Sequence, residues 1–128
     1  MNRLFPLAAL TLAMIAAAHA EDNWQRVKGC AAQAEKWEKK NPPYPGYTGG
    51  YEQHYSPKYD RCYVRWTVIR AHTAGNVAVY LYDAFEDHSL AWASADVAGV
   101  HPGMQGWIEG RFTDYETADR FIEEHRRN

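Results

Sequence analysis

The sequence has no excess of positive charge. Its 14 lysines and arginines are matched by 16 aspartates and glutamates, and the formal net charge is −2 at pH 7. Proteins that bind nucleic acids generally need a concentrated basic face. We therefore do not expect nucleic acid to be the partner of this chain.

Long apolar runs are missing everywhere except at the beginning of the chain. Residues 4–18 are almost entirely apolar, follow Arg3, and lead into the small-residue sequence Ala-His-Ala at 18–20. This combination is typical of a cleaved secretory signal peptide, and the run is shorter than the ~20 residues of a membrane-spanning helix. We predict a signal peptide over residues 1–20. The remainder, residues 21–128, is expected to form a single domain that is periplasmic or secreted and does not span a membrane.

Cysteine is scarce, with only Cys30 and Cys62 present. An even number of cysteines in an exported chain favours a disulfide bond. The alternative is a pair of buried free thiols, which an oxidising compartment seldom preserves. We therefore predict a bond between Cys30 and Cys62.

Hydrophobic spacing predicts a helix over residues 22–40, with Asp22 or Asn23 as its N-cap and two prolines directly after it. Residues 41–60 are rich in Pro, Gly and Tyr and are expected to form a long ordered loop. One face of the predicted helix carries residues at spacings of three and four: Trp24, Val27, Ala31, Ala34 and Trp37.

Alternating apolar residues predict strands over residues 62–69, 77–82, 90–97 and 107–112, the last one weak because of its glycines. Thr113 and Glu116 resemble a capping box at the start of a second helix. The sequence therefore predicts an α+β fold: an N-terminal helix, a three- to four-stranded antiparallel meander and a C-terminal helix. Both helices are expected on one face of the sheet, where the alanines of 90–97 would allow close approach.

Residues 54–64, His-Tyr-Ser-Pro-Lys-Tyr-Asp-Arg-Cys-Tyr-Val, resemble a pattern in small exported bacterial proteins of uncharacterised function. In those proteins a His-Tyr pair shortly precedes a Cys that opens a strand. The similarity extends weakly to residues 80–83 and to the C-terminal helix. Ser56 stands where such proteins often have Asn, and this chain lacks their further cysteines. The resemblance implies export and fold, and it implies no activity.

Aromatic residues are abundant, with five tryptophans and nine tyrosines. Flat rings on an exposed sheet face offer a large contact area to sugars, peptides or other proteins. The alternative is that these rings fill a second sheet face beneath the Tyr-rich loop. The candidate binding residues are His54, Tyr55, Tyr63, Tyr80, Tyr82 and Trp92.

Motifs for metal binding and catalysis are absent from the sequence. Five histidines follow the predicted signal peptide, at positions 54, 72, 88, 101 and 125, without metal-helix spacing. The acidic segment with Asp83, Glu86 and Asp87 lacks the EF-hand ligand series, and we interpret it as a solvated turn. Neither Ser56 nor Ser89 has a nucleophile-elbow context. We predict no metal, no cofactor and no catalytic residue.

These observations favour an exported, non-catalytic binding module, inhibitor-like or accessory, whose partner is a protein or an envelope glycan. Two alternatives remain. One is a small envelope enzyme that uses His54 with nearby tyrosines or acidic residues. The other is a structural subunit of an envelope complex. A cleft in which His54 meets another titratable group would favour the enzyme, and an open aromatic face would favour binding.

Overall fold

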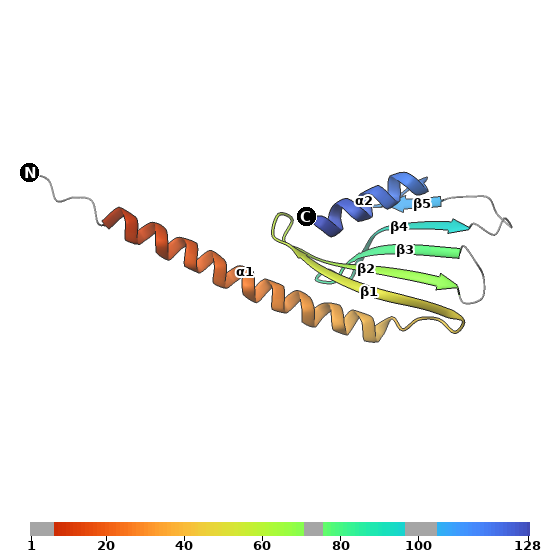
Figure 1. The fold of residues 1–128 in the computed structure, drawn as a ribbon, viewed down its shortest axis with the longest axis horizontal. Helices are drawn as coiled ribbons and strands as arrows, with labels where there is room; N and C mark the ends of the chain where they lie inside the picture. Colours follow the sequence, from red (N-terminus) through yellow and green to blue (C-terminus); the bar gives the residue numbers. More distant parts are fainter. Residues whose placement is uncertain (1–6, 71–75, 97–104) are drawn as a thin grey trace, which may run out of the picture.

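The computed structural model describes residues 7–70, 76–96 and 105–128. Its described elements are a long first helix, then six strands, then a second helix (Figure 1). In chain order they are α1 (Leu7–Lys40), β1 (Tyr47–Ser56), β2 (Arg61–Arg70), β3 (Asn76–Asp83), β4 (His88–Asp96), β5 (Gln105–Ile108), β6 (Arg111–Asp114) and α2 (Tyr115–Arg127).

The strands form one antiparallel sheet in the order β1-β2-β3-β4-β5-β6, so every strand pairs with its neighbours in sequence. The predicted α+β class and the antiparallel meander are confirmed. The predicted number of strands, three or four, was too small. Two separate misreadings of the sequence explain the difference.

The first misreading concerns residues 41–60, which were expected to be a loop and contain β1. The prolines of this region, at positions 42, 43, 45 and 57, all lie outside Tyr47–Ser56. Every backbone N–H of the strand is therefore available, and β1 pairs along its whole length with β2. Its glycines, which weaken a strand, are tolerated at this edge of the sheet.

The second misreading concerns residues 107–112, which were expected to form one strand and instead form a hairpin. Glu109 and Gly110 have φ values of 42° and 92° and make the two-residue turn between β5 and β6. The predicted cap of the second helix moves accordingly. Asp114, and not Thr113, is the N-cap of α2, and its Oδ1 accepts the Thr117 N–H at 2.8 Å.

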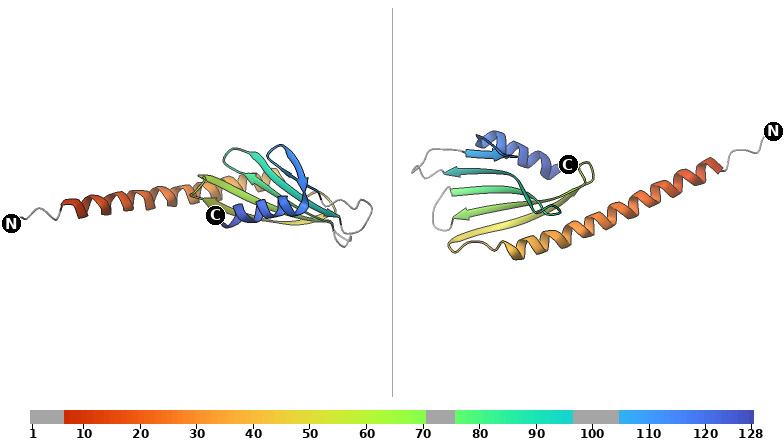
Figure 2. Two further views of the ribbon diagram at one scale, coloured as in Figure 1. Left: turned by 90° about the horizontal axis from the view of Figure 1, so that it is seen from above. Right: turned by 180° about the vertical axis from the view of Figure 1, so that it is seen from behind.

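The first helix extends well past the sheet (Figure 2). Of its predicted apolar face, Ala34 and Trp37 are buried, whereas Trp24 and Val27 are 57% and 41% exposed. Those two residues lie on the part of α1 that has no strand beneath it. The helix also runs without a break through Asp22 and Asn23, so neither residue begins it in this structure.

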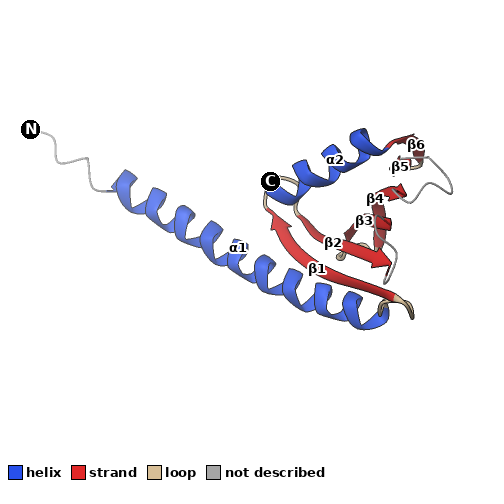
Figure 3. Cartoon of the chain, turned by 45° about the vertical axis from the view of Figure 1, so that its right-hand side comes forward, coloured by secondary structure: helices blue, strands red, loops and turns tan. Residues whose placement is uncertain are grey.

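The two helices pack on opposite faces of the sheet, which corrects the expectation of a shared face (Figure 3). Helix α1 contacts mainly β1 and β2 and buries Trp37 with Val64. Helix α2 lies over the other face and buries Ala118 with Ala91 and Ala93. The alanines of β4 thus admit a helix as predicted, and that helix is α2.

The predicted disulfide is confirmed. Cys30 of α1 and Cys62 of β2 are bonded, with 5.1 Å between their Cα atoms, and both are buried. The bond fixes the first helix to the sheet. In the residues that the structure describes, neither helix has the length and apolar character needed to cross a lipid bilayer.

Candidate ligand-binding face

The face of the sheet that α1 covers at β1 and β2 continues across β4, β5 and β6, where no helix of the described residues lies over it. Residues that are directly paired in neighbouring strands lie on the same face. Starting from Tyr51 on β1, the successive partners are Trp66, Tyr80, Trp92, Trp107 and Phe112, one from each of the six strands. We refer to these six residues as the aromatic row.

The covered end of the aromatic row is more buried than its open end. Trp37 of α1 packs edge-on against both Tyr51 and Trp66, and Trp66 is only 7% exposed. Trp92 is half-buried, and Phe112 at the far end is 81% exposed. The row therefore begins in the core and ends in solvent.

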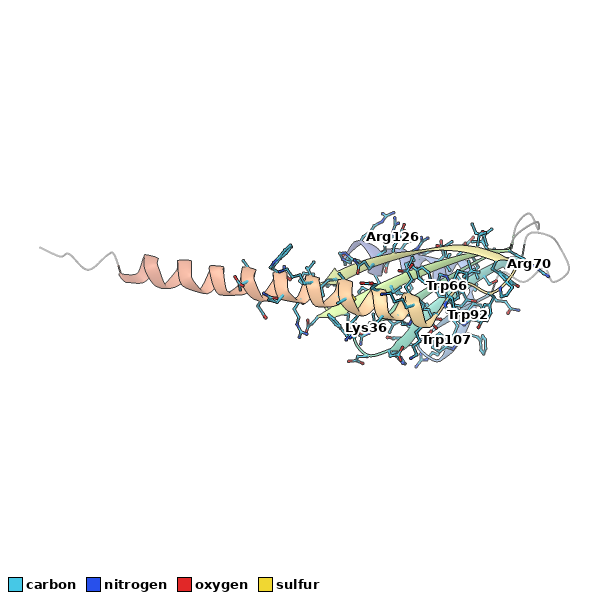
Figure 4. All side chains as sticks on the ribbon, turned by 90° about the horizontal axis from the view of Figure 1, so that it is seen from below. Lys36, Trp66, Arg70, Trp92, Trp107 and Arg126 are labelled. Atoms are coloured by element: carbon cyan, nitrogen blue, oxygen red, sulfur yellow. A yellow bond between two sulfur atoms is a disulfide. The ribbon has the colours of Figure 1, made fainter. Side chains whose placement is uncertain are left out.

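The rings of the row are in contact with one another at several points. Ring centroids are 5.8 Å apart for Tyr51 and Trp66, which are stacked, and 5.3 Å apart for Trp66 and Tyr80. Trp92 meets Phe112 edge-on at 6.5 Å. Figure 4 shows Trp66, Trp92 and Trp107 following one another across the strands. These contacts hold large side chains in a fixed arrangement, which lowers the entropy cost of binding to them.

A groove of about 790 Å³ lies beside the covered half of the row. Strands β1, β2, β3 and β4 contribute to its lining, with Tyr47 on β1 and Ser94 on β4, and so does the connector between α1 and β1. Its aromatic and charged lining residues are Tyr44, Tyr47, Trp66, Arg70, Tyr80 and Tyr82.

A tight turn brings the connector to this groove. Pro45 and Gly46 occupy the centre of the turn, Gly46 has a φ of 84°, and the Tyr47 N–H donates to the Tyr44 carbonyl at 3.0 Å. Proline followed by a glycine of positive φ is the sequence signature of a type II turn. The turn places Tyr44, which is 69% exposed, at the rim of the groove.

The phenols of the groove are close enough to influence one another. Burial raises the pKa of Tyr80 above its ordinary value, and the neighbouring phenols of Tyr44 and Tyr47 raise it further. Burial likewise raises the pKa of Tyr82. These hydroxyl groups stay neutral at physiological pH, so each can both donate and accept a hydrogen bond.

The indole N–H of Trp66 has no acceptor among the described residues. A Cβ atom at Gly49 would lie 3.2 Å from this nitrogen, so the indole reaches over the first strand at its glycine. A buried donor without a partner costs free energy. Stacking and burial of the indole ring therefore have to offset this cost.

The structure separates the residues predicted to form a binding surface. Tyr80, Tyr82 and Trp92 share the face of the aromatic row, as expected. Tyr63 is paired with Asp83 and lies on the opposite face, where it is 2% exposed beneath α2. Its expected outward orientation is wrong, because neighbouring residues of one strand point to opposite faces.

His54 and Tyr55 also lie on opposite faces of β1. Tyr55 is on the side of the aromatic row but at the other end of the strand, where its hydroxyl donates to Asp60 at 2.8 Å. His54 is paired with Tyr63 and lies on the side of α2. The two therefore belong to different surfaces.

His54 lines a hollow of about 350 Å³ next to a ring of ion pairs. In that ring Arg65 lies 3.6 Å from Glu52 and 3.1 Å from Glu123, and Arg126 lies 3.1 Å and 3.2 Å from the same carboxylates. The Nε2 atom of His54 is buried and has no partner among the described residues. Because both carboxylates engage arginines, the ring favours a structural role that ties α2 to β1 and β2.

The other histidines and acids give no metal site in the described residues. Within residues 7–70, 76–96 and 105–128, no three His, Cys, Asp or Glu side chains gather as metal ligands would. Asp83 is buried at the end of β3, where it accepts the Phe85 N–H at 3.0 Å and lies 3.6 Å from Arg61. His72 and His101 lie outside the described residues.

Sequence reasoning missed four of the six residues of the aromatic row and one wall of the groove. Tyr51, Tyr44 and Tyr47 had been assigned to a loop, Trp107 and Phe112 to a single strand, and Trp66 to a strand without a binding role. The available signal was at least one aromatic residue in every predicted strand. That signal becomes a row only when the register of each hairpin is known.

Comparison with known proteins adds nothing to this geometry: no protein-family model matches the chain, and neither a curated protein nor a solved structure matches it. The resemblance of residues 54–64 to small exported bacterial proteins therefore stays a prediction.

Proposed function

We propose that this protein is an exported, non-catalytic binding module, and that the aromatic row is the surface with which it binds an extended component of the cell envelope. The observation that carries the proposal is the row itself: one ring from each of the six strands, all on one face, with neither of the two described helices over its second half. Large exposed apolar patches commonly mark interaction sites.

The length of the row supports an extended ligand. Neighbouring strands lie about 4.8 Å apart, so six rings span about 24 Å from first to last. A compact small molecule would contact two or three of these rings. A linear chain could follow the row from the groove to Phe112.

The groove and the disulfide also support this proposal. Aromatic walls with a few polar groups are typical of ligand sites, and the groove has this composition. A Cys30–Cys62 bond is the expected state of paired cysteines outside the cytoplasm. The predicted signal peptide and the bond point to the same compartment.

The test is a binding comparison between two tryptophan variants of the purified protein. Trp107→Ala removes a ring of the row, whereas Trp24→Ala removes an exposed ring on α1 as a matched control. Immobilised protein is incubated with the polysaccharide and the protein fractions of a bacterial envelope. We expect Trp107→Ala to reduce retention of one fraction at least about fivefold, as hot-spot aromatics do, and Trp24→Ala to leave it unchanged. Equal retention by both variants and the parent would refute the proposal.

The enzyme alternative predicts a different result. It places the chemistry at His54, on the face opposite the aromatic row. A hydrolytic activity on envelope material that His54→Gln abolishes and Trp107→Ala spares would favour that alternative over binding.

A further inference from the structure

The groove beside the aromatic row has a chemistry that narrows the ligand class. We infer that it takes a linear acidic glycan, whose sugar rings stack on the tyrosines and whose carboxylates meet Arg70. This inference rests on the proposed function and specifies the ligand of the same site. It is carried by the side chains that line the groove.

The first argument is the pairing of aromatic rings with hydroxyl groups. A sugar ring has an apolar C–H face and a rim of hydroxyls. The rings of Tyr80 and Tyr82 line the groove, with centroids 6.3 Å apart and an interplanar angle of 23°. Tyr44 and Tyr47 bring two further phenols to the same groove. Stacking satisfies the apolar face of the sugar, and the hydroxyls satisfy its rim.

The second argument is that the hydroxyl groups lining the groove can serve both as hydrogen-bond donors and as acceptors. A phenol or a serine hydroxyl both donates and accepts hydrogen bonds, as a sugar hydroxyl does. A proline-rich peptide, the other common occupant of aromatic grooves, offers mainly carbonyl acceptors, because proline has no N–H. Such a peptide would leave the accepting capacity of four phenols and Ser94 unused. The groove therefore matches a glycan better than a peptide.

The third argument is charge. Among the described residues that line the groove, Arg70 is the charged one, in a protein whose formal net charge is −2. Arg70 lies at the end of β2, on the same face as Trp66 and Val68 (Figure 4). A guanidinium binds a carboxylate through two parallel hydrogen bonds. A local cation in an acidic protein selects an acidic chain over a neutral one.

The experiment measures binding of three probes to the purified protein by tryptophan fluorescence and calorimetry. The probes are a polyuronate hexamer, a neutral glucan hexamer and a proline-rich decapeptide. We expect the polyuronate to bind most tightly and its affinity to fall with added salt. Arg70→Gln should weaken polyuronate binding about tenfold, the effect of losing one charge-assisted pair, and should leave the weak binding of the glucan unchanged.

A matched arginine provides the control. Arg127→Gln removes a side chain that is 74% exposed at the C-terminal end of α2, away from the groove, and should leave all three affinities unchanged. Tyr80→Phe keeps the ring and removes one hydroxyl, and it should weaken polyuronate binding severalfold. Circular dichroism confirms that each variant is folded.

The outcomes separate this inference from the proposed function. Equal affinity for polyuronate and glucan, or no effect of Arg70→Gln, would overturn the acidic assignment and leave the aromatic row as a binding surface. Tightest binding of the peptide would overturn the glycan. Binding of none of the probes would overturn the inference, and the envelope-fraction test with Trp107→Ala would then decide the proposed function alone.

Discussion

The two faces of this sheet are built from the same six strands and have opposite characters. The face beneath α2 carries small and aliphatic side chains, among them Leu81, Ala91 and Ala93, all of which are fully buried. The other face carries the aromatic row, and over the half of the row on β4, β5 and β6 the described part of the chain places no helix. Small side chains let a helix approach closely and close the surface, whereas a row of large rings leaves a surface with area still to bury. The size of the side chains that alternate onto each face thus decides whether a helix covers that face closely or leaves area available for an interaction.

Removal of the disulfide should have the largest effect, because it frees α1, which is the one helix on the aromatic face among the described residues. Replacing Cys30 and Cys62 with serine should lower the free energy of unfolding by about 3–4 kcal/mol, in the chain-entropy account of a 32-residue separation. Urea unfolding with and without reductant measures this. Reduction should destabilise the parent protein and leave the serine variant unchanged. A parent protein that is insensitive to reductant would contradict the prediction.

The next largest effect on stability is expected from truncating a side chain on the closed face, which is the face of the sheet that α2 covers. Ile122 of α2 is 0% exposed against the sheet, and Ile122→Ala should cost about 3 kcal/mol, as deletions of buried aliphatic groups do. The matched change on the open face is Phe112→Ala, at a residue that is 81% exposed, and it should change stability by no more than about 0.5 kcal/mol. Similar losses for both variants would show that the open face is as packed as the closed one.

A smaller effect is expected where the closed face is tightest. A Cβ atom at Gly106 would collide with the Cβ of Ala118 and lie 2.7 Å from the Asp114 carbonyl oxygen. Gly106→Ala should therefore destabilise the protein by about 2 kcal/mol through overpacking. Adding Ala118→Gly should recover part of this loss in a double-mutant cycle. Additive losses from the two changes would contradict a direct contact.

The smallest effect is a dependence on alkaline pH to which the open face contributes through Tyr80 and Tyr82, beside buried phenols such as Tyr63 of the other face. Burial raises the pKa of Tyr80 and Tyr82 in the folded protein above the ordinary value of 10.0. The resulting stabilisation is complete below pH 10 and is lost as the pH rises through the folded-state pKa values. Tyrosine absorbance and unfolding curves between pH 8 and about pH 12 measure this. Phenylalanine at both positions should flatten the profile, and an unchanged profile would contradict the assignment.

The sequence was enough to predict the class of the fold, the two helices, the disulfide and three strand positions. These features depend on local signals: spacing of apolar residues, turn residues and an even cysteine count. The second strand is an example, since Cys62, Val64 and Trp66 alternate and are all buried. A helix against the alanines of 90–97 was also predicted. Both helices were expected there, whereas in the structure α2 packs on these alanines and α1 lies on the other face.

The face assignment could not be predicted, because it depends on register. Tyr63 and Tyr80 were expected on the same face. Tyr80 is paired with Trp66, which points to the opposite face from Tyr63, so Tyr63 and Tyr80 lie on opposite faces. A change of one residue in the register of a hairpin exchanges the two faces of a strand. The edge strand was missed for another reason: Tyr47–Ser56 carries two glycines and lies between prolines, so its local preference is weak and its pairing with β2 determines it.

The meander order sets the length of the aromatic row by the number of strands. Because every strand supplies one ring and lies beside its predecessor in sequence, reach grows in fixed increments of about 4.8 Å per strand. Insertion of one extra hairpin at Glu109-Gly110 would add two such increments without rethreading the chain. Under the proposed function, each added hairpin would lengthen the surface available to a linear polymer by two strand spacings.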